Sequence, residues 1–445
     1  MTTSSSITVT DRIAQLLHEL GIKQAHFAGR SLGDLGGLAV QLPQLFASLT
    51  LVCPSGLDVD LVSPLASRLL VFRGESTGYD AVGKLVASLP GARLAVAHND
   101  AAWSDLIAHH RDDVVAGLLP FLAERTSAAA QSAATTQDGE IGSVAGINYR
   151  VQGAGPPLVL MPLGLIPSQW DPILDVLAES YCTITLGGPH LGMVALLELR
   201  AATVGYRDMV GALLQDVLLD AGHTVLEIGC GTGAISRWLA RRTAGRNPII
   251  GVDVNRYFLR EAADMVRSEG LEGIVQFQEG NAHALPFDDD QFDLTLSATV
   301  LEEVNADAAL AEMIRVTKPG GHVGVIVRAK DVPYFVNLPL DPTIKAKVEH
   351  PSAQGSDAGP DGCADATLYN RFQASPLTNV KMFPYLAALN EPFIIDFFRD
   401  TVSSILDDAE RAALHAACKQ ARVDGTFVFS YPHHCAVGRK LQAAG

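Results

Sequence analysis

The chain has 445 residues, which is more than one ordinary domain, so its length indicates two or three domains. Hydrophobic residues make up 48% and charged residues 18% of the sequence, which excludes a disordered or fibrous chain. The formal net charge is −16 and lysine and arginine form no cluster, so nucleic acid and membrane surfaces are not expected partners. We expect a small-molecule substrate instead.

The cysteine pattern and the first ten residues indicate where in the cell the protein is expected. Six scattered cysteines form no C-x-x-C pair, which favours reduced, buried thiols over a disulfide framework. Residues 1–10 are polar, and no run reaches the roughly eighteen apolar residues of a membrane span. We therefore expect a cytoplasmic protein.

The first third of the chain carries a serine motif. A helix with apolar residues from Ile13 to Leu20 precedes a strand, which leads into Gly29-Arg30-Ser31-Leu32-Gly33. A G-x-S-x-G motif between a strand and a helix is the context of a nucleophile elbow, whose strained turn exposes the serine. This stretch resembles the α/β-hydrolases, and the resemblance implies Ser31 as nucleophile and His98, at the end of a later strand, as base.

The two halves of this resemblance come in inverted order. Residues 147–164 look like the opening hairpin and third strand of the hydrolase fold, although they follow the serine motif in the chain. The Ala/Ser/Thr/Gln-rich stretch 126–142 is the expected linker. We interpret residues 1–190 as an α/β-hydrolase-like domain, either circularly permuted within one chain or completed by exchange in a homodimer.

Hydrolysis by this domain is not expected. Thr77 occupies the position where the family carries the acid of its triad, and Glu75 or Asp80 would have to replace it. The lid insertion is also missing, because only residues 57–67 separate the strands that normally bracket it. We expect an inactive packing or dimerising domain. The alternative is a bifunctional enzyme in which Ser31 acts as nucleophile.

A glycine turn follows the apolar stretch 225–228. Gly229, Gly231 and Ala234 satisfy the G-x-G-x-x-G/A fingerprint, and Asp253 ends the next apolar strand. The helix after the turn directs its N-terminal amides to the place where a cofactor would bind. This motif alone fits a dinucleotide and S-adenosylmethionine equally.

Motifs around the turn decide between these ligands. An acidic residue before the glycines, the loop 279–287 and the turn 315–321 follow in the order of the class I S-adenosylmethionine-dependent methyltransferases, which the chain resembles over about 191–440. The resemblance implies a Rossmann-like α/β domain at 191–445 and S-adenosyl-L-methionine as cofactor. Asn281 stands where the family more often has Asp, although an amide can still hydrogen-bond the adenine edge. The implied cofactor contacts are Tyr206, Glu227, Gly229, Gly231, Gly233, Asp253, Asn281, Ala282 and Ser297.

The acceptor side is less defined. Glu303 stands where many members of the family carry histidine, and its carboxylate is a candidate to take a proton, whereas Glu302 is expected to be a solvated residue at a helix start. Residues 328–376 are too many for an ordinary connection, which predicts a substrate cover. Arg328 and Tyr334 are its candidate substrate contacts.

No metal site is expected. His433 and His434 are neighbours in a predicted strand, so their side chains face opposite sides and cannot share one ion.

The sequence therefore predicts in-line methyl transfer from S-adenosylmethionine to a small molecule, with catalysis by alignment and desolvation. Two other classes stay open. One is an NAD-type dinucleotide oxidoreductase that uses the same turn, and the other is a non-enzymatic assembly module built from two decayed domains. Binding of S-adenosylmethionine against NAD would separate them.

Overall fold

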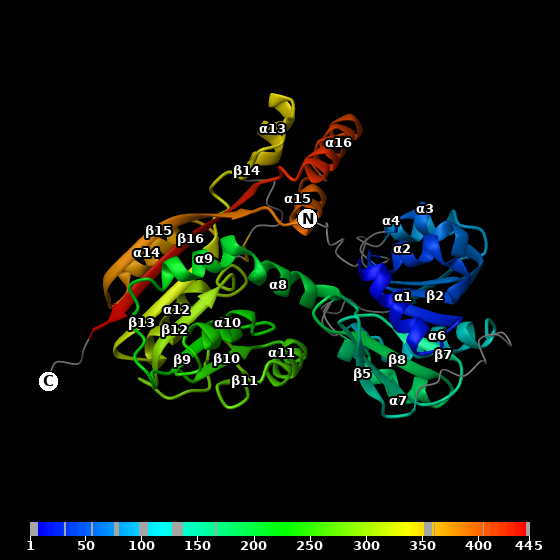
Figure 1. Cartoon of the computed structure of the whole chain (residues 1–445), viewed down its shortest axis with the longest axis horizontal. Coiled ribbons are helices and arrows are strands. Elements are labelled where there is room, and N and C mark those ends of the chain that lie inside the picture. Colours follow the sequence, from blue (N-terminus) through cyan, green and yellow to red (C-terminus); the bar gives the residue numbers. More distant parts are fainter. Residues whose placement is uncertain are drawn as a thin grey trace, which may run out of the picture. The chain divides into compact units, whose positions relative to one another are not determined.

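The computed structural model divides the chain into two compact units, Met1–Leu196 and Leu197–Gly445 (Figure 1). Ser31, His98, Glu75 and Thr77 lie outside the described residues, as does most of the predicted linker. The structure describes residues 8–30, 33–54, 57–74, 80–97, 106–126, 137–164, 167–350, 358–359, 361–403 and 405–441.

The first unit is built on one eight-stranded sheet in the order β4-β3-β2-β1-β7-β8-β6-β5. All but β5 and β6 run parallel, and these two form an antiparallel hairpin at one edge. The central strands are buried on both faces, as continuous apolar runs in a parallel sheet require. The strands are β1 (Ala25–Gly29), β2 (Phe46–Val52), β3 (Leu69–Gly74), β4 (Arg93–Ala97), β5 (Ile141–Val144), β6 (Ile147–Gln152), β7 (Pro157–Leu160) and β8 (Cys182–Gly187).

Helices cover both faces of this sheet with separate apolar cores. One core contains Leu16, Phe27 and Ile184, and the other contains Phe72, Phe121 and Trp170. The helices are α1 (Val9–Glu19), α2 (Gly33–Gln41), α3 (Val59–Val62), α4 (Asp80–Ala87), α5 (Leu106–His109), α6 (Arg111–Ala123) and α7 (Asp171–Ala178), with short 3-10 turns at Pro43–Leu45, Ser63–Arg68 and Pro167–Trp170.

Strands from the two sequence halves meet at β1 and β7. His26 is paired with Leu158 and Ala28 with Leu160 in parallel register. The described sheet therefore takes both halves from one chain, so no exchange of strands between two chains is needed to complete it.

The second unit also contains one sheet, with the order β11-β10-β9-β12-β13-β16-β14 and with β15 paired to β16. Strands β9 to β13 are parallel and β16 is antiparallel to β13, which gives a Rossmann-like α/β fold. The strands are β9 (Val225–Ile228), β10 (Ile249–Asp253), β11 (Val275–Glu279), β12 (Phe292–Ala298), β13 (Thr317–Arg328), β14 (Phe335–Val336), β15 (Leu377–Leu389) and β16 (Phe429–Lys440).

Helices again pack on this sheet, and the boundary between the units falls within α8. The helices are α8 (Gly192–Ala202), α9 (Val204–Leu213), α10 (Ala234–Arg242), α11 (Arg256–Ser268), α12 (Ala306–Val316), α13 (Pro342–Glu349), α14 (Thr367–Ala374), α15 (Pro392–Ser403) and α16 (Asp408–Asp424). No described helix is long and apolar enough to cross a bilayer.

Two element boundaries in this unit are set by local contacts. β13 begins at Thr317, inside the 315–321 motif, and Phe292 of β12 pairs with it across a register shift. α15 and α16 are separate helices, because α16 starts at a capping box in which Asp407 and Glu410 exchange hydrogen bonds.

Four elements, β14, α13, α15 and α16, gather at one end of β16 and form what we call the cap (Figure 1). The cap has its own apolar core, which includes Tyr334, Ile344, Phe398 and Phe429. Because β16 is antiparallel to β13, with His433 opposite Arg328, its first residues lie beyond the carboxyl end of the parallel strands. Ligands bind at this edge of open α/β sheets.

Candidate cofactor and acceptor site

The glycine turn after β9 has three residues in the left-handed region, Gly229, Gly231 and Gly233, with φ of 67°, 52° and 70°. A Cβ on Gly229 would lie 2.2 Å from Val300 Cγ2, and one on Gly233 would lie 2.2 Å from Phe277 Cζ. A Cβ on Gly231 would meet only the tip of a leucine side chain, at 3.3 Å. The outer glycines are therefore needed for packing, whereas Gly231 lies against open space.

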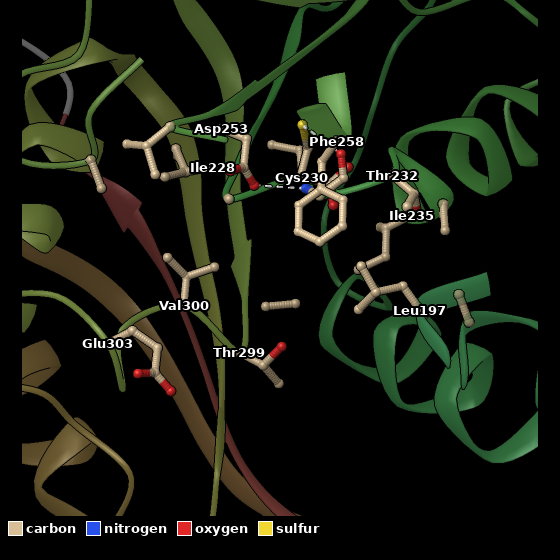
Figure 2. Close-up of a pocket in the computed structure, with 18 of the residues that line it drawn as sticks. Leu197, Ile228, Cys230, Thr232, Ile235, Asp253, Phe258, Thr299, Val300 and Glu303 are labelled. Atoms are coloured by element: carbon tan, nitrogen blue, oxygen red, sulfur yellow. Dashed lines mark hydrogen bonds between the residues drawn. The ribbon is translucent and has the colours of Figure 1, made fainter. Parts of the chain in front are cut away.

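That space is a cavity of about 360 Å³ at the carboxyl ends of β9, β10 and β12. Figure 2 shows Asp253 and Cys230 toward one end of it and Glu303 toward the other. Among the predicted site residues, its lining includes Tyr206, Glu227, Gly229, Gly231, Asp253, Asn281, Ala282, Glu303 and Arg328.

Three predicted site residues do not line this cavity. Gly233 acts through its backbone as the N-cap of α10. Ser297 is fully buried and its hydroxyl donates to the carbonyl of Ile228 at 3.3 Å. Tyr334 is buried in the core of the cap. Sequence spacing placed these residues near the site, but the direction of each side chain depends on packing that spacing does not reveal.

Asp253 closes the turn from the neighbouring strand. Its Oδ2 accepts a hydrogen bond from the amide of Gly231 at 2.9 Å, and its Oδ1 accepts one from the amide of Asn255 at 2.8 Å. Burial raises the pKa of this carboxyl. Each carboxylate oxygen has a second lone pair, so Asp253 can still accept hydroxyl groups from a ligand.

Glu227 is the buried acid of the site. Its Oε2 accepts a hydrogen bond from the hydroxyl of Ser236 on α10, and burial raises its pKa to about 7. At neutral pH the carboxyl is therefore divided between its neutral and ionised forms, and a cationic ligand group would favour the ionised form.

A buried arginine, Arg237, stabilises the glycine turn, and this role was not predicted from the sequence. Arg237 donates to the carbonyl of Thr232 and to the carboxylates of Glu198 and Glu269. Thr232 also donates to Glu198, at 2.6 Å. This network ties α8, α10 and α11 around the glycines. The sequence does indicate an unusual position, because Arg237 is a charged residue between Ile235 and Leu239 on the apolar face of α10.

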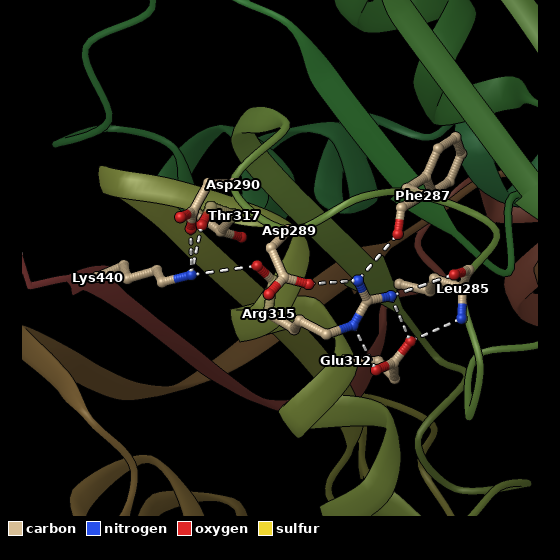
Figure 3. Close-up of polar contacts among 8 residues, drawn as sticks. All are labelled: Leu285, Phe287, Asp289, Asp290, Glu312, Arg315, Thr317 and Lys440. Carbon is tan, nitrogen blue, oxygen red and sulfur yellow. Dashed lines mark hydrogen bonds and ion pairs between the residues drawn. The ribbon is translucent and has the colours of Figure 1, made fainter.

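The loop after β11 borders the cavity with Asn281 and Ala282. The Oδ1 of Asn281 accepts from the amide of His283 at 2.9 Å, which fixes the loop internally. Arg315 holds the rest of the loop, because its guanidinium donates to the carbonyls of Leu285 and Phe287 and to the carboxylates of Asp289 and Glu312 (Figure 3). The arginine of the predicted 315–321 motif therefore has a structural role, which is to position the loop 279–287.

The other end of the cavity carries an ion-pair cluster. Glu302 was expected to be solvated, but its side chain is 0% exposed, and its Oε1 accepts from the amide of Arg328 at 2.7 Å and from Arg328 Nε at 3.3 Å. Glu303 is 69% exposed and binds Arg328 Nη2 at 2.8 Å. Arg328 is thus paired to carboxylates of its own chain.

Behind these residues lies an aromatic group from α9 and β16. The guanidinium of Arg200 lies 5.0 Å from the centre of the Tyr206 ring, and His433 contacts both Tyr206 and Tyr431 edge to face. Arg200 and Tyr206 line the cavity. The side chain of Thr299 is a neighbour of the Tyr206 hydroxyl. The sequence analysis missed Arg200 and assigned no ligand role to His433.

His433 and His434 face different partners. His434 Nε2 pairs with Asp331 at 2.7 Å and its Nδ1 with the hydroxyl of Tyr369 at 2.8 Å. No group of three metal-ligating side chains occurs in the part of the chain that the structure describes.

Comparison with known proteins identifies the class of this unit. Residues 226–325 match the family described as methyltransferase domain, and this stretch runs from the glycine turn into β13. It is therefore a class I methyltransferase domain, a class whose methyl donor is S-adenosylmethionine. The match favours this reading of the glycine turn over the dinucleotide oxidoreductase.

Curated relatives match over a similar stretch. Methyltransferase GfsG of Streptomyces halstedii is 39% identical over 118 residues, which are 26% of this chain and 42% of that protein. The ubiquinone/menaquinone biosynthesis C-methyltransferase UbiE of Idiomarina loihiensis is 36% identical over 121 residues, 27% of this chain and 48% of that protein. The chain thus spans less than half the length of these relatives. Among solved structures, the [4+2]-cyclase SpnF is 22% identical with a TM-score of 0.35, covering 54% of this chain and 82% of that one.

Proposed function

We propose that this protein is an S-adenosylmethionine-dependent methyltransferase that acts on a small molecule. The observation that carries the proposal is the cavity against the Gly231 backbone, where a Cβ on Gly231 would meet only the tip of Leu197 among the described residues and where Asp253 supplies carboxylate oxygens at one wall. The two outer glycines cannot be exchanged without a clash, so the turn is built to bring a ligand to the backbone at its middle residue.

The lining fits the chemical groups of this cofactor. Asp253 can accept from the two ribose hydroxyls, and Asn281 can hydrogen-bond the adenine edge. Glu227 suits the amino group, because a cation there favours its ionised form. Arg200 suits the carboxylate, since it lines the cavity and its buried Nε has no hydrogen-bond partner among the described residues.

The chain's residues would act mainly by positioning. When bound, S-adenosylmethionine would supply an electrophilic methyl group for transfer to an acceptor atom that these residues align with it. Asp253, Glu227 and Arg200 would fix the donor at three points, and the buried wall around Tyr206 excludes water.

Glu303 remains our candidate to receive the proton. Its carboxylate lines the cavity and is bound to Arg328, so it must leave this ion pair, or share it, to act as a base. Arg328 would then be available to an acidic group of the acceptor. The segment 328–376 remains our proposed substrate cover; the amides of Gly359 and Cys363 bind the carbonyls of Glu302 and Leu301 beside this end of the cavity.

The relatives' names leave the acceptor atom open. UbiE is described as a C-methyltransferase of ubiquinone and menaquinone biosynthesis, whereas GfsG is described only as a methyltransferase. We propose a small-molecule acceptor without choosing among oxygen, nitrogen, sulfur and carbon at this stage.

For the first unit we propose an α/β-hydrolase-like domain with inverted halves that does not take part in methyl transfer. The support is the strand order, in which the later hairpin β5–β6 forms one edge and the later strand β7 pairs with β1, the strand before the serine motif. The proposal predicts that Ser31→Ala leaves methyl transfer unchanged. Loss of a measurable esterase activity in this variant would instead favour the bifunctional enzyme.

Calorimetric titration of the whole chain tests the main proposal. We expect S-adenosylhomocysteine to bind and NAD not to bind. Binding of NAD alone would favour the oxidoreductase, and binding of neither would favour the non-enzymatic assembly module.

A further inference from the structure

The part of α8 that belongs to the second unit, residues 197–202, is weakly packed although most of its residues are apolar. None of these residues is buried, and Leu199 is 38% exposed, whereas the next helix, α9, buries Tyr206, Met209 and Leu213. Full burial of a leucine side chain contributes about 2 kcal/mol, so residues 197–202 lack most of the apolar stabilisation that α9 has. Polar contacts therefore matter more for holding this part of α8.

The same residues form one wall of the cavity. Leu197, Arg200 and Ala201 line it, and they follow the i, i+3, i+4 spacing of one helical face (Figure 2). A Cβ on Gly231 would lie 3.3 Å from the Cδ1 of Leu197, so this wall borders the middle of the glycine turn. A ligand against the Gly231 backbone would therefore lie beside α8 as well.

Glu198 joins this weakly packed part of α8 to the glycine turn. Its Oε1 accepts a hydrogen bond from the hydroxyl of Thr232 at 2.6 Å, and its Oε2 accepts one from Nη2 of Arg237. Thr232 is 1% and Arg237 3% exposed, and the side chain of Glu198 is 18% exposed. Charge-assisted hydrogen bonds are roughly twice as strong as neutral ones, so this carboxylate can supply the attachment that apolar packing does not.

Two carboxylates bind Arg237, but they belong to different helices. Glu269, the C-cap of α11, accepts from Nε of Arg237 at 3.0 and 3.1 Å and also binds Arg241. Among the described residues, α11 lines the cavity only with Phe258, near its other end. Glu198 lies next to Leu197 in the chain, so its bonds act directly on the cavity wall, whereas those of Glu269 do not.

We propose that Glu198 is a positioning residue for the cofactor: its carboxylate holds Leu197 and Arg200 against the cavity and thereby slows the release of a bound ligand. This inference rests on the proposed function, because α8 borders the cavity that we assign to S-adenosylmethionine. Glu198 is not among the residues that line the cavity, so it acts through its neighbours on α8. Without its charge, residues 197–202 open more often, since few other contacts hold them.

The first test compares Glu198→Gln with Glu269→Gln. Both substitutions keep the size of the side chain and leave Arg237 with one carboxylate, but only the first leaves a single acceptor oxygen for Thr232 and Arg237 together. Tritium-labelled S-adenosylhomocysteine is bound to the whole chain, and its release into excess unlabelled ligand is followed. We expect release to be about tenfold faster from Glu198→Gln and to change less than about twofold in Glu269→Gln.

Urea unfolding shows whether Glu198 contributes to stability alone. Each substitution removes one ion pair of the buried Arg237, so we expect comparable falls in the midpoint of unfolding. If the release rate merely followed stability, both variants would release the ligand equally fast. That result, or an unchanged release rate in Glu198→Gln, would overturn the proposal.

Amide hydrogen exchange of the ligand-free chain separates this inference from the proposed function. We expect Glu198→Gln to speed exchange in residues 197–202 by about tenfold and to leave α9 unchanged, whereas Glu269→Gln should not affect residues 197–202. If S-adenosylhomocysteine does not bind, the proposed function fails, and this exchange pattern would still support Glu198 as the residue that holds α8. Unchanged exchange in residues 197–202 of Glu198→Gln would contradict that role with or without a ligand.

Discussion

The two ends of the cavity differ in how their polar groups are satisfied. At the cofactor end, Asp253 and Glu227 are held by bonds to Gly231 and Ser236, and Arg237 has partners on all sides of its guanidinium. Toward the end that carries the Arg328 ion pairs, the buried Oε2 of Glu302 has no hydrogen-bond partner among the described residues, and neither do the hydroxyl of Tyr206 and the Nε2 of His433. The polar groups directly around the glycine turn are therefore satisfied within the chain, whereas several polar atoms farther along the cavity wall, including the Nε of Arg200, are not.

The largest effect is expected at Gly231. Gly231→Val should weaken binding of S-adenosylhomocysteine by at least about a hundredfold, because its side chain would occupy the cavity and its φ of 52° is unfavourable to a branched residue. Gly222→Val is the control: its φ is 88° and nothing lies within 4 Å, so it carries the backbone strain without blocking the cavity. Calorimetry should show a loss only in the first variant; tight binding by both would place the ligand elsewhere.

Glu302 and Glu303 allow the contribution of a buried and of an exposed carboxylate to stability to be compared. Glu302→Ala should lower the free energy of unfolding by about 3 kcal/mol, because it leaves Arg328 without its buried partner. Glu303→Ala should cost less than about 1 kcal/mol, since its ion pair is solvent-exposed. Urea unfolding of both variants measures this; similar losses would mean that Glu303 is buried in solution.

Asp253→Ala should weaken binding of S-adenosylhomocysteine by roughly 2 kcal/mol through loss of hydrogen bonds to a charged acceptor. Asp253→Asn separates two roles, because its amide oxygen can still accept from Gly231 while the charge is lost. We expect intermediate affinity for the Asn variant by calorimetry. Unchanged affinity in the Ala variant would exclude Asp253 as a ribose contact.

Glu227 gives a pH-dependent prediction. Because burial raises its pKa to about 7, folding favours the neutral form, and the destabilisation appears as the pH rises through 7. Glu227→Gln should therefore raise the free energy of unfolding at pH 8.5 by on the order of 2 kcal/mol and leave it nearly unchanged at pH 4.5, where the carboxyl is neutral in the folded state and only about half ionised in the unfolded state. Denaturation at both pH values measures this. An equal gain at both would show that charge burial is not the cause.

The smallest effect concerns Arg200. Arg200→Gln should weaken S-adenosylhomocysteine about tenfold, which is the loss expected for one charge-assisted contact, and should leave 5′-methylthioadenosine unaffected, because that analogue lacks the carboxylate. Competitive binding of the two ligands distinguishes this from general damage. An equal loss for both would assign Arg200 to the structure of α8 instead.

The sequence predicted which residues gather at the glycine turn because these residues follow one another closely. Gly229, Gly231 and Asp253 belong to a strand, a turn and the next strand, so their spacing determines their geometry. Contacts between distant segments could not be predicted in this way. His433 reaches Tyr206 only because β16 runs antiparallel to β13, and this pairing joins residues about a hundred positions apart.

The spacing of residues in the sequence also could not predict how deeply each side chain is buried. Glu302 and Glu303 are adjacent in the sequence, yet one is fully buried and the other is exposed. The difference depends on Arg328, at the end of a distant strand, and on the segment around Gly359 that binds the carbonyl of Glu302. The polar and apolar pattern around Glu302 in the sequence therefore could not predict its contacts with Arg328 or with the segment around Gly359.

The cap is separate from the glycine turn, which affects how the two can change in evolution. Its apolar core is separate from the core around β9 and β10, and its elements are supplied by chain segments that leave the parallel sheet after β13. Among the described residues, none that lines the cavity comes from β14, α13, α15 or α16, so sequence changes within these elements leave the cavity lining in place. The four elements are interrupted in the sequence by α14 and β15, which pack in the core of the sheet, so an exchange of the cap between related chains has to retain these two elements.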